Sequence, residues 1–306
     1  MWQGDISFMP DIKFERNNVE KGQVKVFKEM SMKKKVILLA AVILLSAAGL
    51  VQAQEGELGV TLDVTYLSRY IWRGIDLYNN NTSAIQSSID IDFYGTGFGV
   101  KVLSSRANAS GFENAEELDI SLYYGNSLFE GENYATNYQI GWMYYNYPDQ
   151  PRRGGTVTNA GDMQEFFASV SWPEICPAGV VPSYTIVHIW PSRSNNTLNT
   201  VTLPALGRGD VTGQFHIFGL GYDWTIEDFL PETAEQVLHL SADLVYNDGV
   251  FGADHDWSHM LFGVSTDFEV ADDVTFTPAL YYQASMENTV NTQDEFWVGL
   301  SMKYKF

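Results

Sequence analysis

The sequence has little of three things: cysteine, positive charge and long apolar runs. Its 306 residues include one cysteine, Cys176, which excludes an intramolecular disulfide framework and a cysteine-rich metal site. Lysine and arginine number 18, against 38 aspartates and glutamates. So acidic a chain lacks the positive footprint that nucleic acids require, and it is unsuited to electrostatic docking on anionic lipid.

The main apolar run lies near the beginning of the chain. Residues 33–35 are three lysines, residues 36–45 are apolar, and residues 51–53 form a small-residue cleavage site. This order predicts a cleaved secretory signal peptide over residues 32–53. Gln54 follows the cleavage site, so we expect no lipoprotein anchor. Residues 1–31 are a polar lead-in of a kind that signal peptides do not carry, and we interpret them as an over-called start.

Removing the first 53 residues takes away 8 basic and 5 acidic side chains, which leaves 10 and 33 and a formal net charge of −23. No run of about 18 apolar residues remains, so we expect no spanning helix. Residues 54–306 must then form either a soluble exported protein or a membrane β-barrel.

The remainder of the chain is rich in period-two alternation. In the closing stretch, residues 296–306, apolar side chains share one parity and Trp297, Gly299, Ser301, Lys303 and Lys305 share the other. About 10 such residues suffice to cross a bilayer at the tilt of a barrel strand. The terminal Phe306, with Tyr304 two residues before it, is typical of the signal that the barrel assembly machinery recognises. The usual pattern often has glycine where this chain has Ser301.

Further alternating segments recur between turn signals. With the closing stretch they give about twelve strands: residues 58–72, 85–93, 98–103, 118–124, 138–144, 166–170, 183–190, 214–224, 238–246, 260–268, 274–283 and 296–306. We therefore predict an all-β fold, a closed antiparallel transmembrane β-barrel of about twelve strands in the bacterial outer membrane, in contact with lipid and lipopolysaccharide. A soluble β-sandwich also alternates, but it explains neither the export signal nor Phe306.

An even strand number places both termini on the periplasmic side. The longer connections, including residues 79–82 and 191–210, would then lie outside and the short ones inside. The connection over residues 225–235 is long for an inner turn. Parity leaves the inward face of residues 183–190 and 214–224 undecided, because either choice brings apolar side chains inward from the set Val187, Ile189, Phe215 and Phe218. A partly plugged bore is therefore one of the alternatives.

Parity also assigns side chains to the lumen. The candidates for a lumen or constriction site are Arg69, Arg73, Asp63, Asp90, Asp92 and Asp119. We expect Arg69 to pair with Asp63, Asp90 or Asp92, either to brace the wall or to form a constriction that screens solutes. The same parity puts Tyr70 and Trp72 on the lipid side, where they would join Tyr304 and Phe306 in an aromatic girdle.

Four segments carry a resemblance to a known family. Residues 68–75 read Ser-Arg-Tyr-Ile-Trp-Arg-Gly-Ile, and residues 84–86 read Ala-Ile-Gln. Residues 140–148 end in Tyr-Asn-Tyr-Pro, and residues 164–172 form a strand that carries Glu165. In these segments the chain resembles the proteobacterial TorF-type family of proposed porins, also called Gcw_chp. The resemblance implies a barrel and a pore, and it supplies no substrate.

One stretch invites an enzymatic interpretation, because twelve-stranded outer-membrane lipases exist. Ser258 and His259 could form a nucleophile–base pair, but neighbours in a strand should point to opposite faces. Asp248, Asp254 and Asp256 nearby lack the spacing of a calcium loop. We predict no enzyme, no metal and no cofactor, and a passive narrow channel for small hydrophilic solutes with weak cation preference. A structural or adhesive barrel is the alternative, with a lipase a distant third; solute and oligomeric state stay undetermined.

Overall fold

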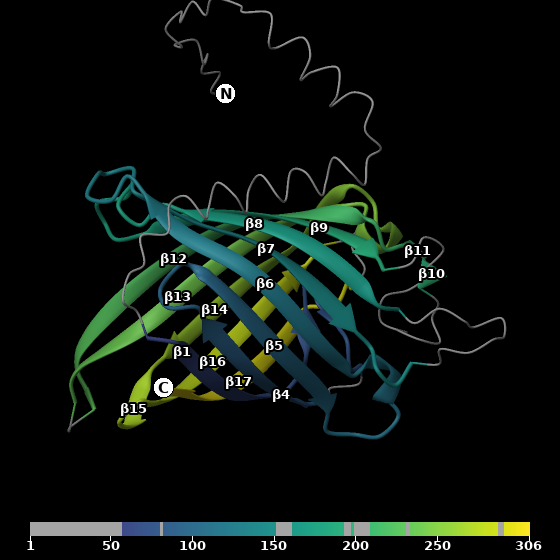
Figure 1. Cartoon of the computed structure of the whole chain (residues 1–306), viewed down its shortest axis with the longest axis horizontal. Coiled ribbons are helices and arrows are strands. Elements are labelled where there is room, and N and C mark those ends of the chain that lie inside the picture. The colour runs from purple at the N-terminus through teal and green to yellow at the C-terminus, as the bar shows by residue number, and fades with distance from the viewer. Residues whose placement is uncertain are drawn as a thin grey trace, which may run out of the picture. The chain divides into compact units, whose positions relative to one another are not determined.

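The chain from Glu55 onward folds as one unit, a closed barrel of antiparallel strands that run obliquely across Figure 1. The computed structural model describes residues 57–79, 82–150, 161–192, 197–198, 209–230, 233–286 and 291–306. The predicted start and signal peptide, residues 1–53, therefore lie outside the described residues, as does most of the predicted outer loop at 191–210. In the described part of the chain, no helix is long and apolar enough to cross a membrane.

Twelve strands make up the wall, since the short strand β15 (Phe268–Ala271) pairs only with β16 and extends β14. They are β1 (Gly59–Leu67), β4 (Ala84–Asp92), β5 (Phe98–Ala107), β6 (Glu117–Leu128), β7 (Thr136–Asn146), β8 (Met163–Ser171), β9 (Val181–Pro191), β12 (Gly213–Leu230), β13 (Thr233–Asp248), β14 (Asp256–Thr266), β16 (Val274–Ser285) and β17 (Glu295–Lys305). The predicted barrel of about twelve strands is confirmed.

The barrel closes where the first strand meets the last. β1 pairs with β4 on one side and with β17 on the other, through partners such as Asp63 and Lys303. The N–H of Phe306 donates to the carbonyl of Val60 at 2.8 Å, which fixes the end of the chain to the wall. Closure leaves no free sheet edge, as a barrel in lipid requires.

The connections at one end of the barrel are longer on average than those at the other. The longer ones, at one end, cover residues 68–83, 108–116, 147–162, 192–212, 249–255 and 286–294, and the shorter ones, at the end that holds Phe306, cover residues 93–97, 129–135, 172–180, 231–232 and 272–273. The predicted difference in length holds for the two sets as wholes but not for each connection, because residues 172–180 at the Phe306 end are more numerous than residues 249–255 at the other. The expected long turn at 225–235 is wrong, because β12 continues to Leu230 and β13 begins at Thr233.

The two faces of the wall differ as the alternation predicts. Large apolar side chains on the outer face are exposed, among them Val64, Leu122, Phe218, Leu220, Leu280 and Leu300. The face of β9 and β12 that the sequence left undecided is now assigned: Val187, Ile189 and Phe215 point inward and are no more than 1% exposed, whereas Phe218 points outward. Part of the inner wall is thus apolar.

That apolar wall packs against a segment that folds into the barrel. β1 ends at Leu67, and residues 68–79, here called the plug segment, turn inward at the end with the long connections. Within it β2 (Ile71–Trp72) and β3 (Ile75–Asp76) form a hairpin whose turn residues, Arg73 and Gly74, both have positive φ, 47° and 86°. A two-residue turn of this kind joins strands tightly.

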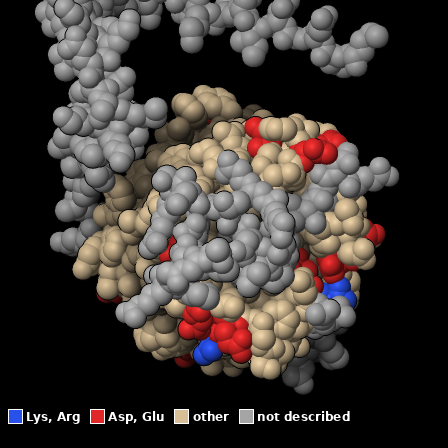
Figure 2. Space-filling model, turned by 90° about the vertical axis from the view of Figure 1, so that its right-hand side faces the viewer, with Lys and Arg blue, Asp and Glu red and all other residues tan. Residues whose placement is uncertain are grey.

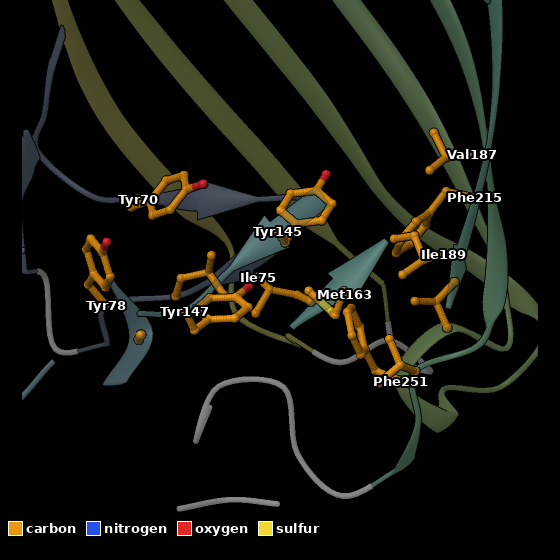
Figure 3. Packing of buried hydrophobic residues seen from close by; sticks show 14 of the residues in the cluster. Tyr70, Ile75, Tyr78, Tyr145, Tyr147, Met163, Val187, Ile189, Phe215 and Phe251 are labelled. Atoms are coloured by element: carbon orange, nitrogen blue, oxygen red, sulfur yellow. The ribbon is translucent and has the colours of Figure 1, made fainter. Parts of the chain in front are cut away.

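The plug segment supplies four residues to the buried cluster of the protein: Tyr70, Ile75, Leu77 and Tyr78. The same cluster includes Tyr145, Met163, Phe215 and Phe251 from the surrounding wall and connections, and Figure 3 shows Tyr70, Ile75 and Tyr78 together with these residues. The prediction that Tyr70 and Trp72 face lipid is wrong. Tyr70 is 7% exposed and Trp72 packs edge-on against Tyr145, because the chain leaves the wall after Leu67 and strand parity no longer applies.

Candidate functional site

The plug segment is held by charged contacts that cross the lumen. Nη2 of Arg73 donates to both carboxylate oxygens of Glu165 on β8, each at 2.8 Å. Glu165 also accepts a hydrogen bond from the hydroxyl of Tyr145 at 2.7 Å. The guanidinium lies 5.5 Å from the ring centre of Trp72 and 5.8 Å from that of Phe215. Because Glu165 is 1% exposed, removal of Arg73 would leave a buried carboxylate without its counter-charge.

A second ion pair joins Arg69 to Glu295 at the start of β17. The predicted partners of Arg69, namely Asp63, Asp90 and Asp92, are therefore wrong, because Arg69 lies on the plug segment and not on a strand. Asp76 faces the same pair. Burial raises the pKa of Asp76 to about 6, with a further increase from the nearby Glu295, while Arg69 opposes both effects. The Oδ1 atom of Asp76 is buried with no hydrogen-bond partner among the described residues.

Neutral contacts complete the docking of the plug segment. Tyr70 donates its hydroxyl proton to Glu117 on β6, and Tyr78 donates to Ser105 on β5 at 3.1 Å. Burial and the neighbouring carboxylates raise the pKa of Tyr70 well above its ordinary value, so its hydroxyl stays protonated as a donor. From the opposite wall, the amide of Gln283 donates to the carbonyl of Gly74 at 3.0 Å. The segment is thus fastened to both sides of the barrel.

The remaining predicted lumen residues do face inward, in two environments. Asp119 lies among the buried groups beside the plug, 6% exposed, and its Oδ1 has no hydrogen-bond partner in the described part of the chain. Asp63 and Asp90 lie nearer the end of the barrel that holds the terminus. Asp63 accepts hydrogen bonds from Thr65 and Ser301, and Asp90 accepts one from Tyr123. Asp92 accepts from the backbone N–H of Gly95 and so stabilises the short turn after β4.

Between the plug segment and the terminus end, the lumen holds a polar cavity of about 340 Å³. The inward faces of β1, β4, β5, β14, β16 and β17 line it. Its residues on β1 and β17 begin at the pair Leu67–Gly299, the last pair before the plug segment, and continue toward the terminus end. Hydroxyl groups, one carboxylate and two ammonium groups dominate the lining. The bore is therefore filled at one end and polar at the other.

The rim at the end with the long connections is acidic. Figure 2 looks at the end of the barrel where β10 (Thr197–Leu198) and β11 (Gly209–Asp210) lie, and acidic side chains gather in several patches there. Arg106 pairs with Glu116, and His255 pairs with Asp248 in the connection after β13. Within the residues that the structure describes, no group of three or more histidine, cysteine or acidic side chains could hold a metal ion.

Ser258 and His259 contradict the expectation that they point to opposite faces. The register between β13 and β14 shifts between Val245 and Tyr246, which makes Ser258 the extra residue of a β-bulge. Its hydroxyl lies 2.9 Å from Nδ1 of His259. Both side chains are at most 3% exposed, and no ion pair joins His259 to a carboxylate in the described residues. The pair thus lacks the orienting carboxylate of a catalytic triad.

Sequence reasoning missed the plug segment and the role of Glu295. The dipeptide Arg73-Gly74 between Trp72 and Ile75 was the available signal, because a glycine flanked by apolar residues favours a hairpin turn. Glu295 shares the inward parity of Trp297 and Gly299, so its lumen position could have been read from the closing strand. Its ion-pair partner Arg69, 226 residues away in sequence, could not have been read from that strand.

The profile of a family described as bacterial protein of unknown function (Gcw_chp) matches residues 52–226. Among solved structures, the NanC porin is similar with a TM-score of 0.49 and 10% identity, over 80% of this chain and 100% of that one. The KdgM porin is similar with a TM-score of 0.46 and 8% identity, over 80% of this chain and 99% of that one.

The COG4313 outer membrane channel from Pseudomonas putida F1 gives a TM-score of 0.46 and 11% identity, over 84% of this chain and 98% of that one. No curated protein matches the chain.

Proposed function

Since this chain belongs to the Gcw_chp family and folds as a closed twelve-stranded barrel, we propose that it is an outer-membrane porin. It would act as a narrow passive channel for small hydrophilic solutes. The observation that supports this most is the contrast between an apolar outer face and a polar lumen cavity of about 340 Å³. An apolar band around a polar interior is what membrane barrels with aqueous channels have in common.

The plug segment sets the width of this channel. Barrels of about eight strands are filled by side chains and barrels of about 16 hold an open channel, so a twelve-stranded barrel has room for a segment in its lumen. The contacts of Arg69, Arg73 and Tyr70 place that segment across the end with the long connections. Solutes would therefore pass beside it or during its release.

The proposed preference is for cations. Inward carboxylates outnumber inward bases along the strands, and wall charges act within about one Debye length, ~8 Å at physiological salt. Asp90 and Asp92 stand near the terminus rim, where acidic groups attract cations. Purified protein in planar bilayers with a salt gradient tests this through the reversal potential. Cation preference should grow at low salt and fall in Asp90→Asn/Asp92→Asn, whereas Glu174→Gln, on an exposed turn, should leave it unchanged.

A reversal potential that favours anions would contradict the proposed preference, and absence of conductance would contradict the pore. The second outcome would support the other candidate, a structural or adhesive barrel that acts through its long connections. The buried plug is the observation that favours that candidate, because 16 residues pack tightly into one cluster around it.

A further inference from the structure

One hairpin of the barrel projects beyond the wall. β12 has 18 residues and β13 has 16, whereas the other strands of the wall have 9 to 12. The extra length lies at the end that holds Phe306, where Figure 1 shows both strands reaching past β15. On the outer face Trp224 is 52% exposed, as expected of an aromatic residue at the membrane interface. The six residues of β12 that follow it extend roughly 20 Å further.

The projecting part of β12 has an open edge. β9 pairs with β12 only as far as Gly221, and no further strand takes its place among the described residues. The wall itself stays closed, but over residues 223–230 every second residue points its N–H and C=O groups to a side without a partner strand. The other side of the hairpin is covered, since Gln236 donates to the carbonyl of Asp267 at 3.0 Å. The hairpin thus offers one edge, that of β12.

The inner face of this projection carries negative charge that its own strands do not compensate. Glu227 and Glu235 stand directly opposite each other in the strand register, and both side chains are exposed. Like charges in such a pair destabilise a hairpin. No lysine or arginine occurs between Arg208 and Lys303. A hairpin that keeps this repulsion suits a positively charged partner.

Histidine does not change the charge at the tip of the hairpin. His239 lies 2.7 Å from Asp223 and 3.7 Å from Asp267, both nearer the wall. In the part of the chain that the structure describes, no ion pair includes Glu227 or Glu235. A partner can therefore reach these two glutamates without displacing an existing ion pair.

The geometry of the edge limits what can add to it. A strand added beside β12 would place every second side chain on the face of Glu227, with about 4.5–5.5 Å between the Cβ atoms of direct neighbours. Lysine or arginine at these positions would supply the missing positive charge. In strand addition of this kind, backbone hydrogen bonds supply affinity and alternate side chains supply specificity. A second copy of the hairpin is a poor occupant, because it would bring four glutamates together.

We propose that the open edge of β12 binds an extended basic segment of a periplasmic protein, which adds as a further strand with lysine or arginine at every second position. The partner would be periplasmic, because an even number of strands places both termini, and with them this end of the barrel, on that side. The edge lies beyond the wall of the lumen. The proposal therefore does not rest on the proposed channel.

Binding is measured by fluorescence anisotropy on the whole purified barrel in detergent, with a labelled decapeptide in which lysine and valine alternate as the probe. Two further peptides separate charge from strand addition. One has glutamate in place of lysine, and the other keeps the lysines but carries N-methyl groups on its backbone amides. Each should bind at least about tenfold more weakly than the lysine peptide at low salt.

Two matched double variants locate the binding site on the barrel. Glu227→Gln/Glu235→Gln should weaken binding of the lysine peptide by about fivefold at low salt, the scale of exposed charge pairs. Glu130→Gln/Glu132→Gln is the control, since these two acids are also exposed and lie at the same end, in the connection between β6 and β7. The control should bind the peptide as the unaltered barrel does.

A shortened hairpin provides a second test. Replacement of residues 226–236 by Asn-Gly would close a tight turn on the pair Thr225–Val237 and should abolish peptide binding. Heat modifiability of each variant verifies that the barrel is intact. Undiminished binding to the shortened barrel, equal binding of the lysine and glutamate peptides, or equal loss in the two double variants would overturn the proposal. So would an N-methylated peptide that binds as tightly, because attraction without strand addition would then suffice.

Discussion

A Cβ atom placed on Gly74 would lie 2.5 Å from Nδ1 of His259. Gly74 has φ of 86°, and it forms the tip of the plug hairpin where the backbone meets the wall at β14. The hairpin therefore reaches the wall only because this residue has no side chain. The position of the plug in the lumen depends on that contact.

Gly74→Ala should release the plug segment in part. The left-handed conformation costs a non-glycine residue about 1–3 kcal/mol, and the overlap with the buried His259 ring adds to it. The expected result is a larger mean conductance in planar bilayers. Gly111→Ala is the control, since Gly111 also has positive φ, 97°, but nothing lies within 4 Å of its added Cβ. Equal conductance of the two variants would mean that the contact with His259 does not hold the plug.

Arg73→Met should release the plug more completely. Removing one partner of a buried ion pair costs about 3–5 kcal/mol, because Glu165 then stays buried as an uncompensated charge. The double variant Arg73→Met/Glu165→Gln should recover much of the closed state, and the cycle measures the coupling. Arg106→Met removes the exposed partner of the buried Glu116, a pair that does not include the plug segment, and should change conductance less. A double variant no more closed than the single one would contradict the role of this pair.

Conductance should fall as the pH is lowered. In the docked plug the pKa of Asp76 is about 6, above its ordinary value of 3.8, so the docked state binds the proton more tightly. Docking is then favoured at low pH and weakens as the pH rises from about 4 to about 6. Asp76→Asn should keep the channel in its low-conductance state across that window. A conductance that rises on acidification, or a variant with the same pH dependence, would be inconsistent with this assignment.

Phe306→Ala should impair insertion of the barrel. The backbone N–H of Phe306 would still donate to Val60, so the change removes only the exposed aromatic ring that we propose the assembly machinery recognises. Phe306→Tyr should insert normally. The yield of heat-modifiable barrel in outer-membrane fractions measures the effect, and an equal yield from both variants would argue against the recognition role.

The sequence predicts some segments of this structure and not others, because different interactions determine the position of each segment. Val64 and Leu122 repeat at period two because one face of every strand is outward, so parity alone located the wall. Tyr70 and Trp72 keep that parity by coincidence. β1 ends at Leu67, whose partners are Ala84 and Gly299, and beyond it no neighbouring strand constrains the alternation.

The partners of the buried charges could not be predicted for a different reason. Which carboxylate meets Arg69 depends on the path of the plug hairpin across the lumen, and that path depends on packing with Met163, Phe215 and Phe251. A one-residue bulge likewise turned Ser258 to the side of His259. Local pattern carries no information about either event.

We propose that the plug segment obstructs an otherwise aqueous barrel. The most direct test replaces residues 71–78 with a glycine–serine linker of equal length and compares single-channel conductance with the unaltered protein. We expect a conductance increase of several-fold with heat-modifiable barrel retained, because the linker loses the contacts of Arg73, Ile75 and Tyr78. An unchanged conductance in an intact barrel would contradict it.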